Sequence, residues 1–200
     1  MTGLSICALI SCASTPSPIE ATTANAGSDT GSDTGSVIAA STEPPATSNG
    51  PASQRPSCDA EIYRAFDFWI GNWDVYTLDE QKAGVNSISR EENSCLLIER
   101  WTSVQGGTGQ SYNFYDPGLK KWRQLWVSRG AVIDYSGGVN AQGEMVLEGT
   151  IAPRLGEQSP FRGVWTPLAD GSVRQYFQQY NRETKEWDDW FTGIYRRQDH

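Results

Sequence analysis

Turn signals recur about every ten residues from position 73 to the end of this 200-residue chain, and this spacing limits the fold more than any other feature. Tight turns are marked by Asp116-Pro-Gly-Leu, Asn140-Ala-Gln-Gly and Ala169-Asp-Gly. Such regular spacing is typical of an all-β sandwich or barrel. We predict ten strands, at 73–78, 85–91, 95–103, 110–116, 121–128, 131–139, 144–151, 161–168, 172–180 and 186–197.

The links between successive predicted strands are short, which favours an antiparallel meander. A meander of this length tends to close on itself, because closure removes exposed strand edges. We therefore predict an up-and-down antiparallel barrel. A short helix is expected just before the aromatic stretch 66–76, where it would cap one end of the barrel.

The aromatic residues divide the chain into a globular part and a tether. All 8 Trp, 8 Tyr and 6 Phe follow residue 60. Residues 13–57 are instead rich in Ser, Thr, Gly and Pro, and they include the tandem repeat Gly27-Ser-Asp-Thr-Gly-Ser-Asp-Thr-Gly-Ser36. Such a segment cannot bury enough apolar surface to offset its ordering entropy. We predict a disordered tether at 13–57 and one β-barrel domain at 58–200.

Residues 1–12 form an apolar stretch that is too short to span a bilayer, which needs about 20 apolar residues. They resemble the remnant of a secretory signal peptide. Within them, Leu9-Ile10-Ser11-Cys12 resembles the lipobox of bacterial lipoproteins, whose cysteine carries a diacylglycerol. This resemblance implies lipidation of Cys12 and an exported protein, anchored to a membrane and facing the periplasm or the exterior. A chance cysteine in a truncated leader is the alternative, because no Lys or Arg precedes the apolar residues.

Composition excludes several classes of partner and site. Acidic residues outnumber basic ones by 24 to 16, and no basic cluster is longer than Lys120-Lys121 or Arg196-Arg197, so duplex nucleic acid is not an expected partner. The only histidine is His200. Catalytic triads and dyads that need histidine, His-rich zinc sites and His-ligated haem are therefore not expected. The sequence predicts neither a metal site nor a cofactor.

The alternating direction of successive strands in a meander brings Cys58 and Cys95 to the same end of the barrel. The barrel end at which the first strand starts also receives the preceding helix and the turn after the second strand. In an oxidising compartment the two thiols would form a disulfide, worth about 4 kcal/mol in the chain-entropy model. A pair of free thiols is the alternative.

Gly71-Asn72-Trp73, at the entry to the first strand, is similar to the G-x-W signature of calycins, the lipocalin-type barrels. In that family a short helix precedes the signature, and an arginine late in the last strand packs on its tryptophan. The resemblance implies a calycin-like barrel in which Arg196 and Arg197 lie beside Trp73 and close the barrel. These three residues are expected to be structural.

The run from Cys58 to the C-terminus also resembles a group of bacterial exported proteins and lipoproteins of unknown function. The shared pattern comprises Phe66-Asp-Phe-Trp-Ile-Gly-Asn-Trp, Cys95 with Glu99-Arg-Trp101, Gly109-Gln-Ser-Tyr-Asn-Phe-Tyr-Asp116, Lys121-Trp-Arg-Gln-Leu-Trp126 and Val173-Arg-Gln175. This resemblance implies a fold and an exported location, and it carries no activity.

Strand alternation places aromatic and uncharged polar side chains on one face of several strands. This mixture suits the lining of a small ligand cavity. The predicted ligand-binding residues are Glu99, Trp101, Asn113, Tyr115, Trp122, Gln124, Trp126 and Gln175. The alternative is a solid core, because small barrels fill their interiors with side chains. We expect the longer loops to gather at the end opposite the helix.

Glu99 is the candidate catalytic residue. In an aromatic cup, desolvation would raise its pKa and suit it to general acid–base chemistry, with Tyr115 as a second group. The alternative is a structural ion pair, for example with Arg90 across the hairpin.

Three functions follow from these features. The first is an exported, lipid-anchored barrel that binds a small, partly apolar molecule in its cup. The second is an isomerase, lyase or hydrolase that uses the same cup, and the third is a ligandless envelope protein that acts through its outer surface. The lack of a catalytic histidine and of a nucleophile motif favours binding over catalysis.

Overall fold

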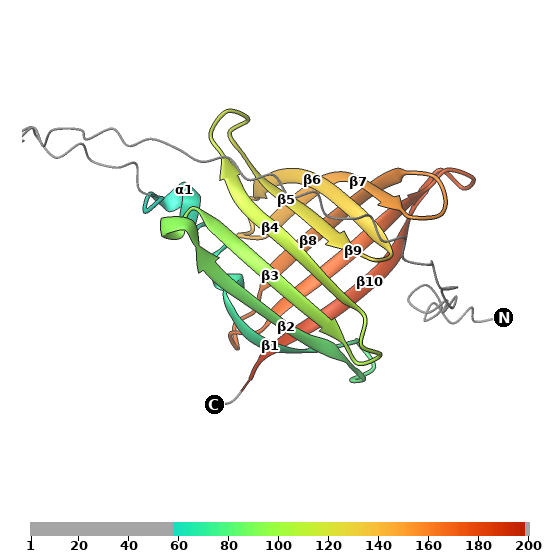
Figure 1. Ribbon diagram of the computed structural model, residues 1–200, viewed down its shortest axis with the longest axis horizontal. Coiled ribbons are helices and arrows are strands. Elements are labelled where there is room, and N and C mark those ends of the chain that lie inside the picture. Colours follow the sequence, from blue (N-terminus) through green and yellow to red (C-terminus); the bar gives the residue numbers. More distant parts are fainter. Residues whose placement is uncertain (1–57, 199–200) are drawn as a thin grey trace, which may run out of the picture. The chain divides into compact units, whose positions relative to one another are not determined.

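The computed structural model describes residues 58–198. Its ten strands form a closed antiparallel barrel, in which β1 pairs with both β2 and β10 (Figure 1). The strands are β1 (Gly71–Tyr76), β2 (Lys82–Glu91), β3 (Leu96–Ser103), β4 (Thr108–Asp116), β5 (Lys121–Ser128), β6 (Ala131–Val139), β7 (Met145–Pro153), β8 (Ser159–Pro167), β9 (Val173–Asn181) and β10 (Glu186–Arg197).

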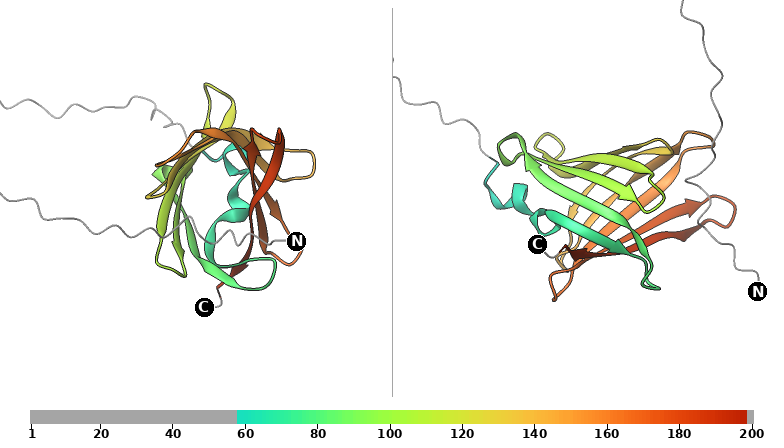
Figure 2. Two further views of the ribbon diagram at one scale, coloured as in Figure 1. Left: turned by 90° about the vertical axis from the view of Figure 1, so that its right-hand side faces the viewer. Right: turned by 60° about the horizontal axis from the view of Figure 1, so that its bottom comes forward.

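The predicted up-and-down barrel is confirmed. All ten predicted strands are present, and those at 121–128, 131–139 and 186–197 have the predicted ends. The left view of Figure 2 shows the strands as a ring, with the segment that contains α1 inside its outline. The predicted leader, the lipobox cysteine Cys12 and the tether lie outside the described residues.

Three short helical segments lie at the end of the barrel where β1 starts. They are α1 (Glu61–Arg64), η1 (Asp67–Trp69) and η2 (Glu92–Ser94). The predicted helix before the aromatic stretch is therefore present as α1. Within residues 58–198, no helix has the length and apolar character needed to cross a membrane.

Aromatic side chains from and around η1 plug this end of the barrel. Phe66 and Trp69 are fully buried and stack with their ring centroids 4.9 Å apart. Trp165 of β8 meets Phe66 edge-on at 5.3 Å, and the Trp73 indole donates to the Trp69 carbonyl at 2.9 Å. These rings exclude water from the closed end and make it the most apolar part of the interior. We call them the plug, and the opposite end the mouth.

The predicted disulfide between Cys58 and Cys95 is present, with its Cα atoms 5.0 Å apart. Cys95 directly follows η2, at the end of the barrel that also receives the chain before α1. The disulfide therefore fastens the segment that carries the plug to the β2–β3 connection.

The β1–β10 seam is short, because β1 pairs only with residues 194–197 of β10. Side chains reinforce this seam. The Arg197 guanidinium lies 4.4 Å from the centre of the Trp73 ring and donates to the Ile70 carbonyl at 3.2 Å. Gln198 adds two hydrogen bonds, from its backbone N–H to the Asn72 carbonyl and from its side chain to Asp74.

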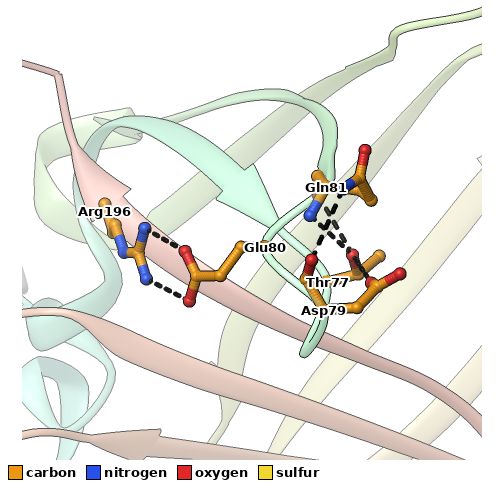
Figure 3. Close-up of polar contacts among 5 residues, drawn as sticks. All are labelled: Thr77, Asp79, Glu80, Gln81 and Arg196. Atoms are coloured by element: carbon orange, nitrogen blue, oxygen red, sulfur yellow. Dashed lines mark hydrogen bonds and ion pairs between the residues drawn. The ribbon is translucent and has the colours of Figure 1, made fainter.

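Arg196 does not lie beside Trp73, and the prediction for this residue is wrong. Neighbouring residues on a strand point to opposite faces, so Arg196 and Arg197 cannot share one contact. Arg196 forms a two-pronged ion pair with Glu80 of the β1–β2 loop, at 2.7 and 2.8 Å (Figure 3). In the same loop the Thr77 hydroxyl accepts a hydrogen bond from the Gln81 backbone (Figure 3). Arg196 thus ties this loop to the last strand.

The connections do not differ in length between the two ends, so the expectation of longer loops at the mouth is wrong. The mouth connections are 77–81, 104–107, 129–130, 154–158 and 182–185. Those at the plug end are 92–95, 117–120, 140–144 and 168–172. The two ends differ instead in what fills them, since only one receives the plug.

Candidate functional site

Buried polar side chains form a belt across the middle of the barrel, between the plug and the mouth. Strand alternation turns them inward, and the outward residues between them are more exposed. The belt, as we name this set, consists of Asn86, Glu99, Ser111, Asn113, Gln124, Tyr135, Gln175 and Tyr195. Its members come from β2, β3, β4, β5, β6, β9 and β10, so the belt follows the wall around most of the circumference.

Hydrogen bonds in the belt run in one direction on the β4–β6 side and end on Glu99. The chain of donors is Tyr135 to Gln124, Gln124 to Asn113, Asn113 to Ser111, and Ser111 to Glu99. The Asn113–Ser111 distance is 2.8 Å, and the Ser111–Glu99 distance is 2.6 Å. Bonds aligned in this way polarise one another, and here they favour negative charge on the carboxyl group.

Glu99 is a buried acid whose hydrogen-bond partners are all neutral. It is 4% exposed, and it accepts from the Asn86 amide at 2.7 Å and from the Ser111 hydroxyl. Burial raises its pKa to about 7, and the two hydrogen bonds only partly oppose this rise. At neutral pH the carboxyl group therefore exists in both protonation states. Such shifted acids are concentrated at functional sites.

The predicted ion pair between Glu99 and Arg90 is not formed. In the β2–β3 register Ile88 lies opposite Glu99, and Arg90 lies opposite Leu97, one step nearer the plug. Arg90 pairs there with Asp67 of η1. The hairpin register thus separates the acid from Arg90, the arginine that was given as an example of its partner.

Two tyrosines lie close enough to Glu99 to respond to its charge. Burial, and then the nearby carboxyl group, raise the pKa of Tyr135 and of Tyr195 well above the ordinary value. Both phenols are therefore neutral at physiological pH. The Tyr195 hydroxyl donates to Gln175 at 2.9 Å and accepts from Asn86 at 3.2 Å.

Asn86 carries a buried acceptor with no partner. Its amide nitrogen donates to both Glu99 and Tyr195. An ionised carboxylate can only accept, so the nitrogen must face it and Oδ1 must point elsewhere. That oxygen is buried and has no hydrogen bond. Leaving a buried acceptor unpaired costs about 1–3 kcal/mol, which a ligand donor would recover.

The structure brings together half of the predicted ligand-binding residues and places the others elsewhere. Glu99, Asn113, Gln124 and Gln175 belong to the belt. Trp101 and Trp126 lie above it toward the mouth, opposite Asn86 and Ser111 in the strand registers. Together with Phe177 and Phe191 they form what we call the upper layer, whose rings are partly buried.

Tyr115 and Trp122 lie at the plug end and do not meet Glu99. The Tyr115 ring packs edge-on against Tyr63 at 5.2 Å, and the Trp122 indole donates to the Ile62 carbonyl at 3.0 Å. Tyr115 is therefore not placed to act with Glu99 as the second acid–base group. Sequence reasoning missed Asn86, Tyr135 and Tyr195, although alternation within their own strands would have turned each of them inward.

Inward-facing glycines seat the aromatic rings of the upper layer. A Cβ atom on Gly84 would lie 2.7 Å from the Trp101 ring, and one on Gly109 would lie 2.2 Å from the Trp126 ring. Since real Cβ contacts are longer than this, only glycine lets each ring rest against the backbone of the neighbouring strand. The Phe191 ring lies 2.7 Å from the Cβ position of Gly193, two residues further along the same strand, so this position also needs glycine.

A bulge in β10 shapes the mouth. The β9–β10 register shifts between Asp189 and Phe191, and the extra residue, Trp190, packs edge-on against Phe161 at 5.5 Å. Trp190 remains 38% exposed. Because β1 reaches only residues 194–197, the part of β10 from 186 to 193 pairs on one edge, with β9.

A hollow of about 490 Å³ lies at this part of the mouth, and we call it the rim hollow. Its inner wall includes Ser159, Gln179 and Trp190. The charged residues around it are Glu157, Glu183, Asp188, Asp189 and Arg182. Carboxylates therefore outnumber cations around the rim hollow, and Arg182 lies 3.7 Å from Glu157.

A second hollow, of about 640 Å³, is lined by residues of β3, β4 and β5 and by Arg129 of the connection that follows β5. It is lined by Arg100 and Arg129 and by no carboxylate. Of the predicted ligand-binding residues, Trp101 lines this hollow and none lines the rim hollow.

Within residues 58–198, no three His, Cys, Asp or Glu side chains are grouped so as to hold a metal ion. Comparisons with protein-family models and with curated proteins found no match for this chain.

Proposed function

We propose that this protein is an exported barrel that binds a small, partly apolar molecule between the belt and the mouth. The belt would form the polar floor of the cup and orient the ligand. The upper layer would form the apolar wall, with Trp101 and Trp126 as its largest surfaces. Ligand sites typically combine apolar walls with a few convergent polar groups in this way.

The observation that carries the proposal is Glu99. Replacing a buried ionisable group without a cationic partner by a neutral one often stabilises a fold, so a barrel built only for stability has no need of this acid. Its two neutral donors and the free acceptor on Asn86 leave the centre of the barrel able to receive a further donor.

Acid–base catalysis in the same cup is the second candidate, and the pKa of Glu99 favours it. A carboxyl group with a pKa of about 7 can take up and release protons near neutral pH. In this case the phenols of Tyr135 and Tyr195, rather than Tyr115, would be the nearby donors. The reaction would be an isomerisation, an elimination or a hydrolysis.

A calycin-like relationship and attachment to the cell envelope through Cys12 belong to the same proposal. The closed barrel and the contact of Arg197 with Trp73 support the first. The lipobox resemblance of Leu9-Ile10-Ser11-Cys12 supports the second. Substituting Cys12→Ser is expected to release the protein from the membrane fraction of a host that processes lipoproteins. Unchanged membrane association would exclude the anchor.

Native mass spectrometry of the full chain, purified from a host without denaturation, tests the binding function. We expect a bound small molecule that is lost from a Glu99→Gln variant and retained by Glu148→Gln, a matched change on the outer face of β7. A molecule that is released chemically altered would favour the enzyme. Absence of any bound molecule, together with no binding in a screen of small ligands, would leave the ligandless envelope protein.

A further inference from the structure

The barrel centre is rich in acceptors and lacks cations. Glu99 has two oxygens and receives one neutral hydrogen bond on each. Asn86 Oδ1 receives none, although Asn86 is only 2% exposed. Throughout residues 58–198, no Lys or Arg side chain bonds to a belt residue, and Arg90 is held by Asp67. A ligand that completes this site must bring donors, and a positive charge would match the carboxylate.

Two unpartnered donors also lie in the interior, and they belong to the plug side. The indole N–H groups of Trp69 and Trp165 have no hydrogen bond. Both rings pack against Phe66, and they lie 5.6 Å from each other. The unpaired acceptor belongs instead to the belt residue Asn86, which is paired in register with Trp101 of the upper layer.

The rim hollow carries the same sign of charge as the centre. The rim hollow is lined by four carboxylates and one arginine, and that arginine already lies near Glu157. Asp188 accepts one hydrogen bond, from Asn181 at 2.9 Å, and keeps further acceptor sites. A cleft lined by one sign of charge attracts ligands of the opposite sign and raises their association rate. The second hollow, which is lined by Arg100 and Arg129, belongs to β3, β4 and β5, and none of these strands lines the rim hollow.

The walls between mouth and belt suit a cation as well. Trp101 and Trp126 lie along the wall on Gly84 and Gly109, both rings are partly buried, and Trp101 lines the second hollow. Trp190 adds an exposed ring at the rim. Aromatic faces attract ammonium groups through their quadrupole, most strongly for tryptophan.

We infer that the ligand of the cup is a small organic cation, an ammonium group on an apolar body. Its N–H groups meet the Glu99 carboxylate and Asn86 Oδ1, and its body lies against the upper layer. This inference rests on the proposed binding function and names the ligand class of that site.

Calorimetry of the full chain with matched probe pairs tests the inference. The probes are butyl-, cyclohexyl- and phenethylammonium, each compared with the alcohol of the same carbon skeleton, and phenylacetate as an anion. At pH 8 we expect at least one ammonium probe to bind about tenfold or more tightly than its alcohol, and phenylacetate to bind most weakly. Glu99→Gln should abolish the difference within a pair, whereas Glu148→Gln should keep it.

The pH dependence of the wild-type chain gives a second readout that needs no variant. The groups facing Glu99 are Asn86, Ser111 and the phenols of Tyr135 and Tyr195, and both phenols stay neutral. An alkylammonium stays charged up to about pH 10. Its affinity should therefore rise roughly tenfold or more from pH 5.5 to pH 8, as Glu99 ionises, while the affinity of the alcohol changes little.

The outcomes separate the inference from the proposed function. Equal affinities within every pair, or tightest binding of phenylacetate, would overturn the cation while leaving a binding cup in place. Lack of binding by every ammonium probe at millimolar concentration would also overturn it. The proposed function would then depend on the co-purified molecule alone, and a neutral or anionic molecule there would identify a different ligand class.

Discussion

The plug and the two tryptophans of the upper layer hold their aromatic rings in different ways. In the plug, ring packs on ring: Phe66 stacks on Trp69 and meets Trp165 edge-on. In the upper layer, Trp101 and Trp126 rest on the backbone at Gly84 and Gly109. Ring-on-ring packing fills the plug end, whereas the two tryptophans are seated on the backbone and remain partly buried.

This difference shows that aromatic density does not by itself identify a site. The densest aromatic stretch of the chain, 66–76, contributes the plug and the first strand. The candidate site has fewer aromatic side chains, and the polar residues of the belt come from strands spread over the whole domain. The following changes test this division between a stabilising end and a binding end.

Two tryptophans on the same face of β5 provide the largest expected contrast. Trp122 is 3% exposed and packs edge-on against Phe66 of the plug, whereas Trp126 is only partly buried. We expect Trp122→Ala to lower the free energy of unfolding by about 3–5 kcal/mol, because it leaves a cavity among buried rings. Trp126→Ala should cost about 1–2 kcal/mol and weaken binding of the ammonium probes. Urea titration and calorimetry measure the two effects, and equal losses of stability would contradict the division.

Removing the disulfide tests how far the plug end depends on its covalent fastening. Cys58 and Cys95 are 37 residues apart, and closing a loop of this size is worth about 4 kcal/mol in the chain-entropy model. The double substitution Cys58→Ser, Cys95→Ser should lower the free energy of unfolding by about this amount. The variant should still bind the probes, because the disulfide lies at the plug end and contacts no belt residue directly. If the urea midpoint does not move, the disulfide has no stabilising role.

The buried carboxyl group should make stability depend on pH. Its pKa is about 7 in the folded protein, against an ordinary value of 4.5. The folded state therefore keeps a proton that the unfolded chain has lost, so the contribution of Glu99 is fully present below about pH 4.5 and is lost as pH rises through about 7. The loss amounts to about 3 kcal/mol.

Glu99→Gln removes this titration and is the matched comparison. Urea titrations at pH 5 and pH 8 should show that the wild-type chain loses more stability than the variant over this range. Glu148→Gln, a change of an exposed residue, should follow the wild type. Parallel pH profiles for wild type and Glu99→Gln would mean that the acid is not held in the shifted state described above.

The smallest contrast separates the two terminal arginines. Arg197 covers the buried Trp73 ring, and its removal should cost about 1 kcal/mol through the lost cation–π contact. Arg196 pairs with Glu80 at the surface, so Arg196→Ala should lower the thermal midpoint by less, and high salt should reduce its effect further. A larger shift for Arg196→Ala would reverse this assignment.

Much of the fold could be predicted because its signals are local. Turn residues recur at regular intervals, and side chains alternate along each strand, so the ten strands and the inward direction of Glu99, Asn113, Gln124 and Gln175 follow from neighbouring residues alone. The pairing of Cys58 with Cys95 could be predicted because successive strands of a meander alternate in direction, which places both cysteines at one end of the barrel. The contact of Arg197 with Trp73 came from a resemblance, and alternation explains why Arg196 does not share it.

Only the tertiary structure decided the position of each inward residue along the barrel axis, between the plug and the mouth. Tyr115 and Trp122 have the same inward direction as Asn113 and Gln124, yet they reach the plug and not the cup. This axial position depends on strand register, and register depends on pairing between distant segments and on irregularities such as the shift beside Phe191. For this reason the sequence alone determined a barrel with a polar interior, while the tertiary structure decided that Asn86, Tyr135 and Tyr195 surround Glu99.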